Sequence, residues 1–285
     1  MMTPANTPSS SQVPSAADVE LIEAEAWAEL QLNLPADFQT RMGISVQRRN
    51  GAVLLIASNS PTLSINRVIG LGLVGALTEK ELDEVVDAYS SCGVERFIVQ
   101  WSPAAEPAIA REWLFARGFN VLPRAITKVY RRAGPTHALV ADPLLRVTEI
   151  GRDDAQVFED VVAAPLGVPD GLGVGIRSTI GLPGWRFYLV YDGQRPIAGS
   201  ALYVRGRMAW CGLGATIETD RRRGAQAALL ARRLHDAALD DCEWVTADTL
   251  AETTERASQS YRNMTRAGFT TLYDRPNYLL DLRTR

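Results

Sequence analysis

The sequence has few of the residues that metal centres, disulfide frameworks and nucleophilic triads require. Among its 285 residues are three cysteines, Cys92, Cys211 and Cys242, and two histidines. The cysteines are odd in number, scattered and without CxxC spacing, so neither a disulfide framework nor a zinc knuckle is expected. His137 lies in an expected linker and His235 on an arginine-rich helix face, which argues against a histidine-based metal site or a Ser-His triad.

An excess of either charge is also absent. Lys and Arg number 30 against 33 Asp and Glu, for a net charge of −3, so no global attraction to nucleic acid or to an anionic membrane is expected. No apolar run approaches the roughly 18 residues of a membrane span. Residues 1–15 have no basic segment and no apolar core, so we expect a disordered tail and not a signal peptide. With so few cysteines, we expect a cytoplasmic protein. We also expect a monomer or a homodimer.

What the sequence does contain is an α/β pattern that occurs twice. Each half has a buried strand, then a helix, then a Gly-Phe pair, then a terminal strand. The buried strands are expected at 97–101 and 244–249, and the pairs are Gly118-Phe119 and Gly268-Phe269. A stretch with two prolines and a glycine, residues 131–144, separates the halves. The order of elements predicts one α/β fold repeated twice.

Local patterns place the remaining elements around these landmarks. Thr78 and Glu81 fit a capping box that opens a helix to about Ser91. The other expected elements of the first half are a helix at 17–32, strands at 43–48 and 52–58, an apolar run at 67–74, a helix at 107–116 and a strand at 127–130. Those of the second half are strands at 145–150, 186–191, 197–204, 208–217 and 278–282, and helices at 153–163, 224–240 and 258–267. The first helix is expected to bury one apolar face, formed by Val19, Ile22, Ala26, Trp27 and Leu30.

The segment from Gly214 to Leu230 carries the clearest chemical signal. An apolar strand enters a polar turn with Arg221, Arg222 and Arg223, and a helix rich in small residues follows Gly224. A helix N-terminus offers about four unpaired amides and a partial positive charge. Glycine lets a bulky anion approach the backbone, and arginines add charge-assisted hydrogen bonds. The pattern predicts a cradle for a pyrophosphate, with three arginines on a solvated helix start as the alternative.

This segment resembles the phosphate-binding loop of the GNAT acetyltransferase superfamily, which follows the fourth strand and reads Q/R-x-x-G-x-G/A. Arg221 stands at the first position and Gly224 at the glycine, whereas Gln226 takes the place of the final Gly or Ala. The resemblance implies that main-chain amides of 223–228 hold the pyrophosphate of coenzyme A and that the strand end pairs with the pantetheine arm. The expected coenzyme-binding residues are Ala215, Thr216, Ile217, Arg221, Arg222, Arg223, Gly224, Ala225, Gln226, Ala227, Ala228, Ser258 and Tyr261.

A second element of the family is a helix that ends in a small residue, Gly and Phe, here at 267–269. Many GNAT enzymes place a tyrosine five residues before the Phe, as the acid for the leaving thiolate, but that position is Met264. Tyr261, one turn earlier, is the candidate acid that the resemblance implies; a ring beside the coenzyme and a buried core tyrosine are the alternatives. Candidates for the base are Glu218 and Asp248, each near a strand end, where each also fits a surface or capping carboxylate.

The resemblance covers about 145–282, and the first half matches the same fold only in outline. Where its phosphate loop would lie, residues 76–81 have no arginine or glycine and two glutamates that would repel phosphate. The resemblance therefore implies an α/β (α+β) tandem of two GNAT-like domains, each a mixed, mostly antiparallel twisted sheet flanked by helices. The expected division is a degenerate domain at 16–132, a linker at 133–144 and the acetyltransferase domain at 145–285.

The implied reaction is direct transfer of an acetyl group from acetyl-CoA to an amine of an unidentified small-molecule acceptor, with no metal. A main-chain amide of 212–216 would bind the developing oxyanion. The glycine-rich stretch 167–175 is either a loop over the acceptor site or a connector. A non-catalytic acyl-CoA sensor is the alternative, because Gln226 and Met264 depart from the family pattern. A nucleotide-dependent oxidoreductase rests only on the GxGxxG match at 70–75.

Overall fold

The computed structural model describes residues 13–136, 139, 141–167 and 173–284. The helices are α1 (Ala16–Leu32), α2 (Ala36–Met42), α3 (Glu79–Ser91), α4 (Ala110–Ala116), α5 (Ala155–Leu166), α6 (Gly173–Thr179), α7 (Ala225–Leu239) and α8 (Gln259–Arg266). The strands are β1 (Ile44–Arg49), β2 (Ala52–Ala57), β3 (Arg67–Ile69), β4 (Arg96–Gln100), β5 (Asn120–Val121), β6 (Ile126–Arg132), β7 (Leu145–Ile150), β8 (Trp185–Asp192), β9 (Arg195–Arg205), β10 (Met208–Thr216), β11 (Trp244–Leu250), β12 (Thr270–Arg275) and β13 (Asn277–Asp281). Single 3-10 turns include η1 (Leu63–Ile65) and η3 (Glu218–Asp220). His137, most of the expected tail and the middle of the 167–175 stretch lie outside the described residues.

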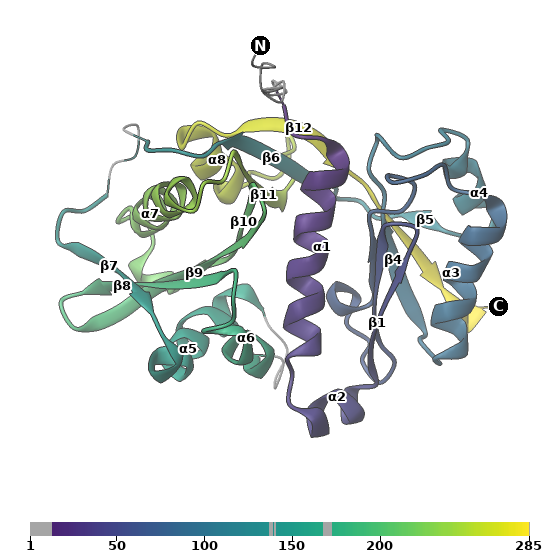
Figure 1. Cartoon of the computed structure of the whole chain (residues 1–285), viewed down its shortest axis with the longest axis horizontal. Helices are drawn as coiled ribbons and strands as arrows, with labels where there is room; N and C mark the ends of the chain where they lie inside the picture. Colours follow the sequence, from purple (N-terminus) through teal and green to yellow (C-terminus); the bar gives the residue numbers. More distant parts are fainter. Residues whose placement is uncertain (1–12, 137–138, 140, 168–172, 285) are drawn as a thin grey trace, which may run out of the picture.

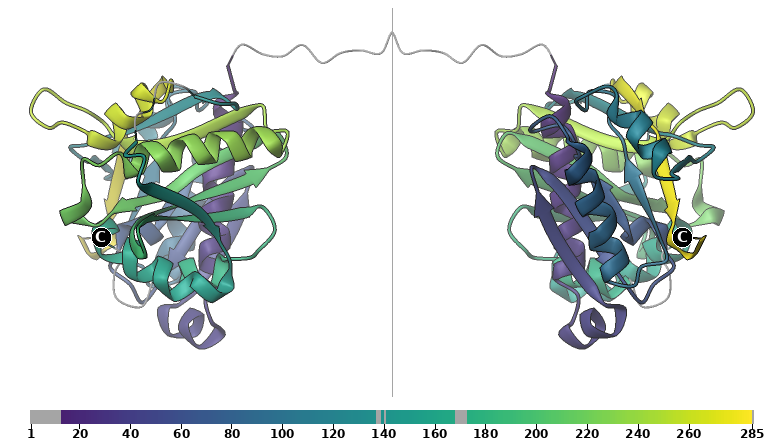
Figure 2. Two further views of the ribbon diagram at one scale, coloured as in Figure 1. Left: turned by 90° about the vertical axis from the view of Figure 1, so that its left-hand side faces the viewer. Right: turned by 90° about the vertical axis from the view of Figure 1, so that its right-hand side faces the viewer.

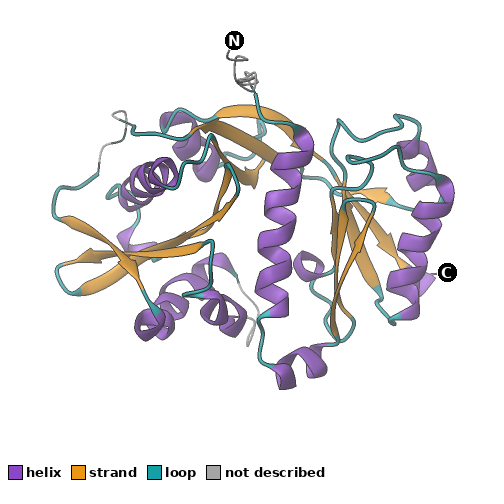
Figure 3. Cartoon of the chain, in the orientation of Figure 1, coloured by secondary structure: helices purple, strands orange, loops and turns teal. Residues whose placement is uncertain are grey.

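The strands form two sheets, and α1 stands between them (Figure 1 and Figure 3). Sheet A has the order β1-β2-β3-β4-β13-β5, and sheet B has the order β12-β6-β11-β10-β9-β8-β7. The neighbours β3–β4 and β10–β11 run parallel, and the other neighbours run antiparallel. Helices α3 and α4 pack on sheet A, α7 and α8 on one face of sheet B, and α5 and α6 on its other face. The expected mixed, mostly antiparallel sheets flanked by helices are thus confirmed.

Helix α1 is buried on opposite faces, whereas the sequence predicts one apolar face. Ala24 and Ala28 pack against sheet A, and Ile22, Ala26 and Leu30 pack against sheet B. The small side chains allow a close approach to sheet A, and the large ones fill the wider space on the other side. The helix therefore belongs to both cores, and a pattern search for a single apolar stripe misses half of its contacts.

Each half of the chain gives its last strand to the sheet of the other half. Strand β6 lies between β11 and β12 in sheet B. The C-terminal strand β13, yellow in Figure 2, lies between β4 and β5 in sheet A. Asn277–Asp281 pairs along its length with Gln100–Arg96. The expected boundaries at 132 and 145 therefore do not separate the two sheets, because the backbone hydrogen bonds of each sheet include a strand from the far half.

A buried ionic cluster ties α1 to both sheets. Glu23 Oε2 lies 2.7 Å from Lys128 Nζ of β6 and 2.8 Å from Arg275 Nη1 at the end of β12. Arg275 also pairs with Glu20. Arg67 Nη1 of β3 lies 4.0 Å from Glu23 Oε1. These five side chains are all buried. Because a buried charge is tolerated only with its partners in place, the cluster fixes the position of α1 against both sheets.

The first half has no free helix N-terminus where a phosphate loop would lie. The hydroxyl of Thr78 accepts a hydrogen bond from the amide of Glu81. The Glu81 carboxylate accepts one from the amide of Thr78 at 2.7 Å. This confirms the expected capping box. The carboxylate of the protein itself occupies the place that an anion would need.

The other departures from the expected elements are short pieces. Helix α2 and strand β5 have no clear periodicity in the sequence, and β12 extends the Gly-Phe turn into sheet B. Helix α6 begins inside the stretch predicted as a glycine-rich loop, and it packs on sheet B through Ile176. No helix in the described part of the chain is both long enough and apolar enough to cross a lipid bilayer.

Candidate functional site

Strands β10 and β11 separate after a short parallel pairing. Met208–Cys211 is in register with Trp244–Ala247, and the pairing ends there. On the other side of β10 the register with β9 slips between Gly212 and Ala215, and Leu213 has a positive φ of 53°. A positive φ is uncommon for leucine and marks a local constraint. The bulge turns β10 away from β11 and opens a gap in sheet B.

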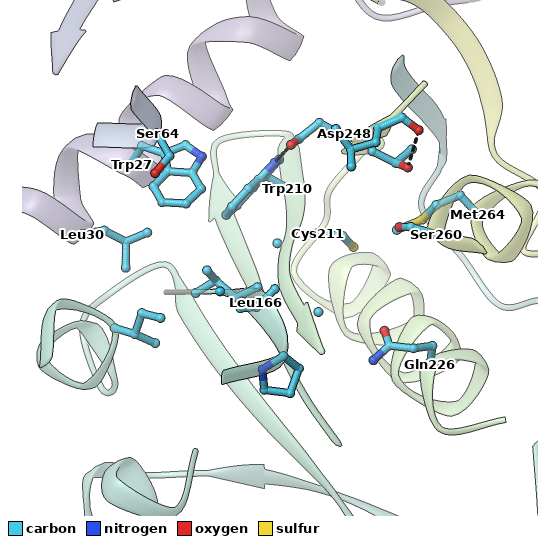
Figure 4. Close-up of a pocket in the computed structure, with 18 of the residues that line it drawn as sticks. Trp27, Leu30, Ser64, Leu166, Trp210, Cys211, Gln226, Asp248, Ser260 and Met264 are labelled. Atoms are coloured by element: carbon cyan, nitrogen blue, oxygen red, sulfur yellow. Dashed lines mark hydrogen bonds between the residues drawn. The ribbon is translucent and has the colours of Figure 1, made fainter. Parts of the chain in front are cut away.

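A cavity of about 650 Å³ occupies this gap and extends to both faces of the sheet. Figure 4 shows Trp27 and Leu30 of α1 on one side, and Gln226 of α7 with Met264 of α8 on the other. Pro165, Leu166, Gly167 and Gly175 also line it, so both ends of the predicted glycine-rich loop border the cavity. The volume is in the range of small-molecule sites. The first half of the chain thus supplies one wall of a site in the second half.

The N-terminus of α7 has the geometry of an anion cradle. Gly224 adopts a left-handed conformation with φ of 83°, Arg222 does so with φ of 68°, and no side chain caps the helix. The first amides of α7 therefore point outward without a capping acceptor, next to the end of β10. Ala225, Ala227 and Ala228 follow in the first turns. This is the place where the sequence predicts that pyrophosphate binds.

The three arginines of the turn differ in their contacts and in their exposure. Arg223 donates to Asp192 at 2.6 Å and to Asp142 at 3.0 Å, and these hydrogen bonds raise its pKa above the ordinary value. Arg223 therefore fixes the turn, and Asp142 from the expected linker helps to hold it. Arg221 and Arg222 are exposed, and their guanidinium groups are the ones that a phosphate can reach.

Gln226 lies against the end of β10, where the family resemblance places the pantetheine arm. Its Nε2 donates to the carbonyl of Ala215 and to Thr216 Oγ1, both at 2.9 Å. A Cβ atom added at Gly214 would lie 3.1 Å from Gln226 Oε1. The primary amide thus forms, with the strand end, the hydrogen bond that a pantetheine amide would form. Ile217 continues the chain and donates its amide to Ile197 at 2.9 Å.

Helix α8 meets the cavity through residues other than Tyr261. Ser258, Gln259, Ser260 and Met264 line the cavity. The Tyr261 hydroxyl instead shares a hydrogen bond of 3.0 Å with Thr271 Oγ1 of β12. Ser258 caps the helix by accepting the amide of Tyr261, and its hydroxyl lies 2.9 Å from Thr249 Oγ1.

The two candidate bases lie in different places. The Glu218 side chain in η3 is 86% exposed and lies 3.7 Å from Arg221. Asp248 is on the cavity wall. Its Oδ1 accepts a hydrogen bond from Trp210 Nε1 at 2.7 Å and lies 3.9 Å from Lys128 Nζ. Of the two carboxylates, only Asp248 is placed to meet a ligand in the gap.

Two further features of the cavity wall have no motif in the sequence. Arg233 of α7 is 1% exposed, and in the described part of the chain its guanidinium donates only to main-chain carbonyls, those of Leu229, Ala201 and Gly212. Trp27 and Gln31, from α1, lie far from any loop that the sequence singles out. Their spacing of four residues on one helix face predicts core packing, and only the tertiary structure brings them to the gap.

Cysteine and metal chemistry find little support in the described residues. Cys211 lines the cavity, but burial raises the pKa of its thiol, so the reactive thiolate is disfavoured. His235 is exposed on α7. No group of three or more His, Cys, Asp or Glu side chains with metal-binding geometry occurs in the part of the chain that the structure describes.

Comparison with known proteins relates this geometry to a known fold. No protein-family model and no curated protein matches the sequence. Among solved structures, the GCN5-related N-acetyltransferase from Kribbella flavida matches with a TM-score of 0.59 at 12% identity, over 94% of this chain and 95% of that chain. The GCN5-related N-acetyltransferase from Sphaerobacter thermophilus matches with 0.60 at 14%, over 94% of each chain. A tandem GNAT protein from the clavulanic acid biosynthesis pathway matches with 0.57 at 14%, over 93% of each chain. At these identities the likeness shows a shared fold, and it confirms the expected tandem GNAT architecture.

Proposed function

We propose that the protein is an N-acetyltransferase that moves an acetyl group from acetyl-CoA to an amine in the gap between β10 and β11. The observation that carries this proposal is the placement of two features on one cavity. The bulge at Gly212–Ala215 opens the sheet, and the uncapped N-terminus of α7 lies at the end of the same strand. An anion cradle that leads directly to a strand gap fits a coenzyme with a diphosphate and a long thioester arm.

In this proposal the coenzyme lies along β10 from the turn to the gap. The amides of 223–228 and the side chains of Arg221 and Arg222 hold the diphosphate. The pantetheine arm pairs with Ala215–Ile217, and the Gln226 side chain moves aside to release the Ala215 carbonyl. Ser258 at the start of α8 borders the arm on the opposite side of the gap.

The chemical step needs two functions from the protein. The main-chain amides of Leu213 and Gly214, which fall in the register slip of β10, lie where they can donate to the oxyanion that forms on the thioester carbonyl. The amine nitrogen attacks that carbonyl carbon, the C–S bond breaks, and the thiolate of coenzyme A leaves. Asp248 is the carboxylate in the gap that accepts the proton from the amine, directly or through water. The departing thiolate, with an ordinary pKa of about 8.5, takes its proton from solvent.

Direct transfer is favoured over an acyl-enzyme at cysteine. Cys211 is the cysteine on the described cavity wall, and burial raises the pKa of its thiol. No histidine lies among the described lining residues to act as its base. The role of Tyr261 as the acid stays a prediction, and its hydrogen bond with Thr271 makes that role depend on a rotation of the side chain.

A second candidate function, an acyl-CoA sensor without catalysis, is favoured by Gln226. A side chain that already occupies the coenzyme track could serve as a reporter of coenzyme binding. The two functions are separated by incubating the protein with acetyl-CoA and a panel of amines, and by following the free thiol of coenzyme A. The enzyme proposal predicts release of thiol that depends on both protein and amine. Coenzyme binding without any such release would favour the sensor.

A further inference from the structure

The wall on the α1 side of the cavity is built by the first half of the chain. Trp27, Leu30 and Leu34 contribute apolar surface, and Ile65 of η1 adds to it. This wall lies across the gap from the N-terminus of α7, so it faces the end of the coenzyme that carries the acyl group. An acceptor that reaches the thioester must therefore lie against a surface that is mostly apolar.

One buried oxygen on this wall has no hydrogen-bond partner. Gln31 is 3% exposed and lines the cavity. Its Nε2 donates to the carbonyl of Ile65 at 2.9 Å, and that bond fixes the amide so that Oε1 is left unpaired. Buried amide oxygens are almost always paired in proteins. Trp27 Nε1 on the same wall is likewise buried without a partner, so a ligand in the cavity meets mainly the apolar surface of this wall.

A carboxylate lies near the same wall. Asp248 is the acidic side chain among the described lining residues, and it is 24% exposed. Trp210 Nε1 donates a hydrogen bond to Oδ1 at 2.7 Å, while Oδ2 has no hydrogen bond among the described residues. Lys128 is completely buried behind it, 3.9 Å away. The free oxygen of Asp248 is therefore the part of this group that a ligand can contact.

Two arginines also line the cavity. Arg124 donates its Nε to the carbonyl of Ala251, beyond the end of β11. Arg233 is buried on the α7 side of the sheet and donates to carbonyls there. Asp248 Oδ2 is thus the carboxylate oxygen that a ligand can contact, beside mostly apolar walls.

Two indole rings lie in edge contact on the cavity wall. Trp27 and Trp210 have ring centroids 6.1 Å apart at an angle of 62°. The guanidinium of Arg67 covers one ring at 4.3 Å from the centroid of Trp27, so that face is already occupied. The remaining indole surface suits an apolar or aromatic body, and a cation beside an indole is favoured.

Resting on the proposed function, we infer that the acetyl acceptor is a primary amine on an apolar, alkyl or aryl body. Its ammonium group binds Asp248 Oδ2, and its body lies against the apolar wall that Trp27, Leu30 and Trp210 form. The first half of the chain has no anion cradle of its own, and it serves as the acceptor-recognition half of the protein. Polyhydroxylated amines are disfavoured because their hydroxyl groups would meet apolar walls without partners.

The test is a calorimetric titration of three probe amines, 2-phenylethylamine, hexylamine and glucosamine, into the full-length protein, with and without saturating coenzyme A. We expect 2-phenylethylamine and hexylamine to bind at least about tenfold more tightly than glucosamine. Asp248→Asn keeps the shape of the side chain and an oxygen that accepts from Trp210, but it removes the charge. This variant should weaken the binding of 2-phenylethylamine at least about tenfold. The control Asp274→Asn, on β12 and bonded to Thr127, should leave it unchanged.

Coenzyme binding is measured separately on the same samples. If coenzyme A binds but neither apolar amine does, or if glucosamine binds as tightly as they do, the acceptor inference is wrong and the proposed function stands. It is also wrong if Asp248→Asn and Asp274→Asn bind 2-phenylethylamine alike. If the amines bind as expected but coenzyme A does not, the acceptor site is supported and the proposed function fails.

Discussion

Asp248 and Trp210 join the two strands whose separation opens the cavity. The indole N–H of Trp210, on β10, donates to the carboxylate of Asp248, on β11, at 2.7 Å, just beyond the last parallel pair of these strands. The bond holds a carboxylate at the edge of the gap and leaves its second oxygen toward the cavity. The same contact thus limits the width of the gap and positions the carboxylate that the proposed mechanism uses as the base.

Replacing Gln226 should strengthen coenzyme binding. The side chain donates two hydrogen bonds to the strand end that the pantetheine arm would use, and net hydrogen bonds contribute about 0.5–1.5 kcal/mol each. Gln226→Ala should therefore lower the Kd of coenzyme A about tenfold in isothermal titration calorimetry. Gln259→Ala, which changes another glutamine on the cavity wall, is the matched control. An equal or higher Kd for Gln226→Ala would show that this glutamine assists binding.

The amino-acid sequence predicts most of the second half of the fold, including the strand, turn and helix at the expected coenzyme loop. The strand, basic turn, glycine and small-residue helix around Gly224 form a local signal, and local signals do not depend on distant contacts. The capping box at Thr78 is likewise local. The exchange of β6 and β13 could not be predicted, because periodicity identifies a strand but not the sheet that it joins.

The α1 side of the cavity could not be predicted for a related reason. Trp27 and Gln31 read as part of an amphipathic helix, and nothing in their spacing shows that a gap in a distant sheet lies opposite. Glu20 and Glu23 read as solvent-facing charges on that helix. Only the strands that carry Lys128 and Arg275 turn them into a buried cluster.

Cys211 should be dispensable for turnover. Burial raises the pKa of its thiol, and direct transfer gives it no covalent role. Cys211→Ala should keep kcat within about threefold of wild type once an acceptor is in hand, with a modest loss of stability from the missing sulfur. A loss of turnover together with an acetylated Cys211 in intact-mass spectra of wild type would instead establish an acyl-enzyme.

Tyr261→Phe should change turnover by less than about threefold. The hydroxyl is bonded to Thr271 Oγ1, whereas other residues of α8 line the cavity. The steady-state kcat and KM of the two proteins give the measurement. A fall of about 10²–10⁴ in kcat, the usual contribution of an acid–base group, would assign the acid role to Tyr261 and require that it rotates toward the gap.

Stability should depend on pH through Glu23. Burial by itself raises its pKa, but attraction by Arg275, Lys128 and Arg67 outweighs burial and holds the pKa well below the ordinary value. A carboxylate with a lowered pKa in the folded state contributes stability above its unfolded pKa of about 4.3, and the contribution is lost as the pH falls through the folded pKa. The urea-derived free energy of unfolding should therefore decline below about pH 5.

The matching variant tests the cluster itself. Glu23→Gln leaves Lys128 and Arg275 with one buried carboxylate fewer, so it should lower the free energy of unfolding by about 3–5 kcal/mol at pH 7 and flatten the acid decline. The exposed Glu95→Gln is the control. If both variants match wild type in free energy and in pH slope, the cluster does not fix α1.

The most direct measurement is the binding of coenzyme A to wild type, Gly224→Asn and Gly224→Asp by isothermal titration calorimetry. Gly224 is left-handed, with φ of 83°, and Asn and Asp tolerate that conformation about equally, so the two variants differ mainly in charge. We predict that wild type binds, that Gly224→Asn binds within several-fold of it, and that Gly224→Asp loses about 100-fold or more, since a carboxylate would face the diphosphate. No binding to wild type, or equal binding to all three proteins, would contradict a coenzyme site at the start of α7.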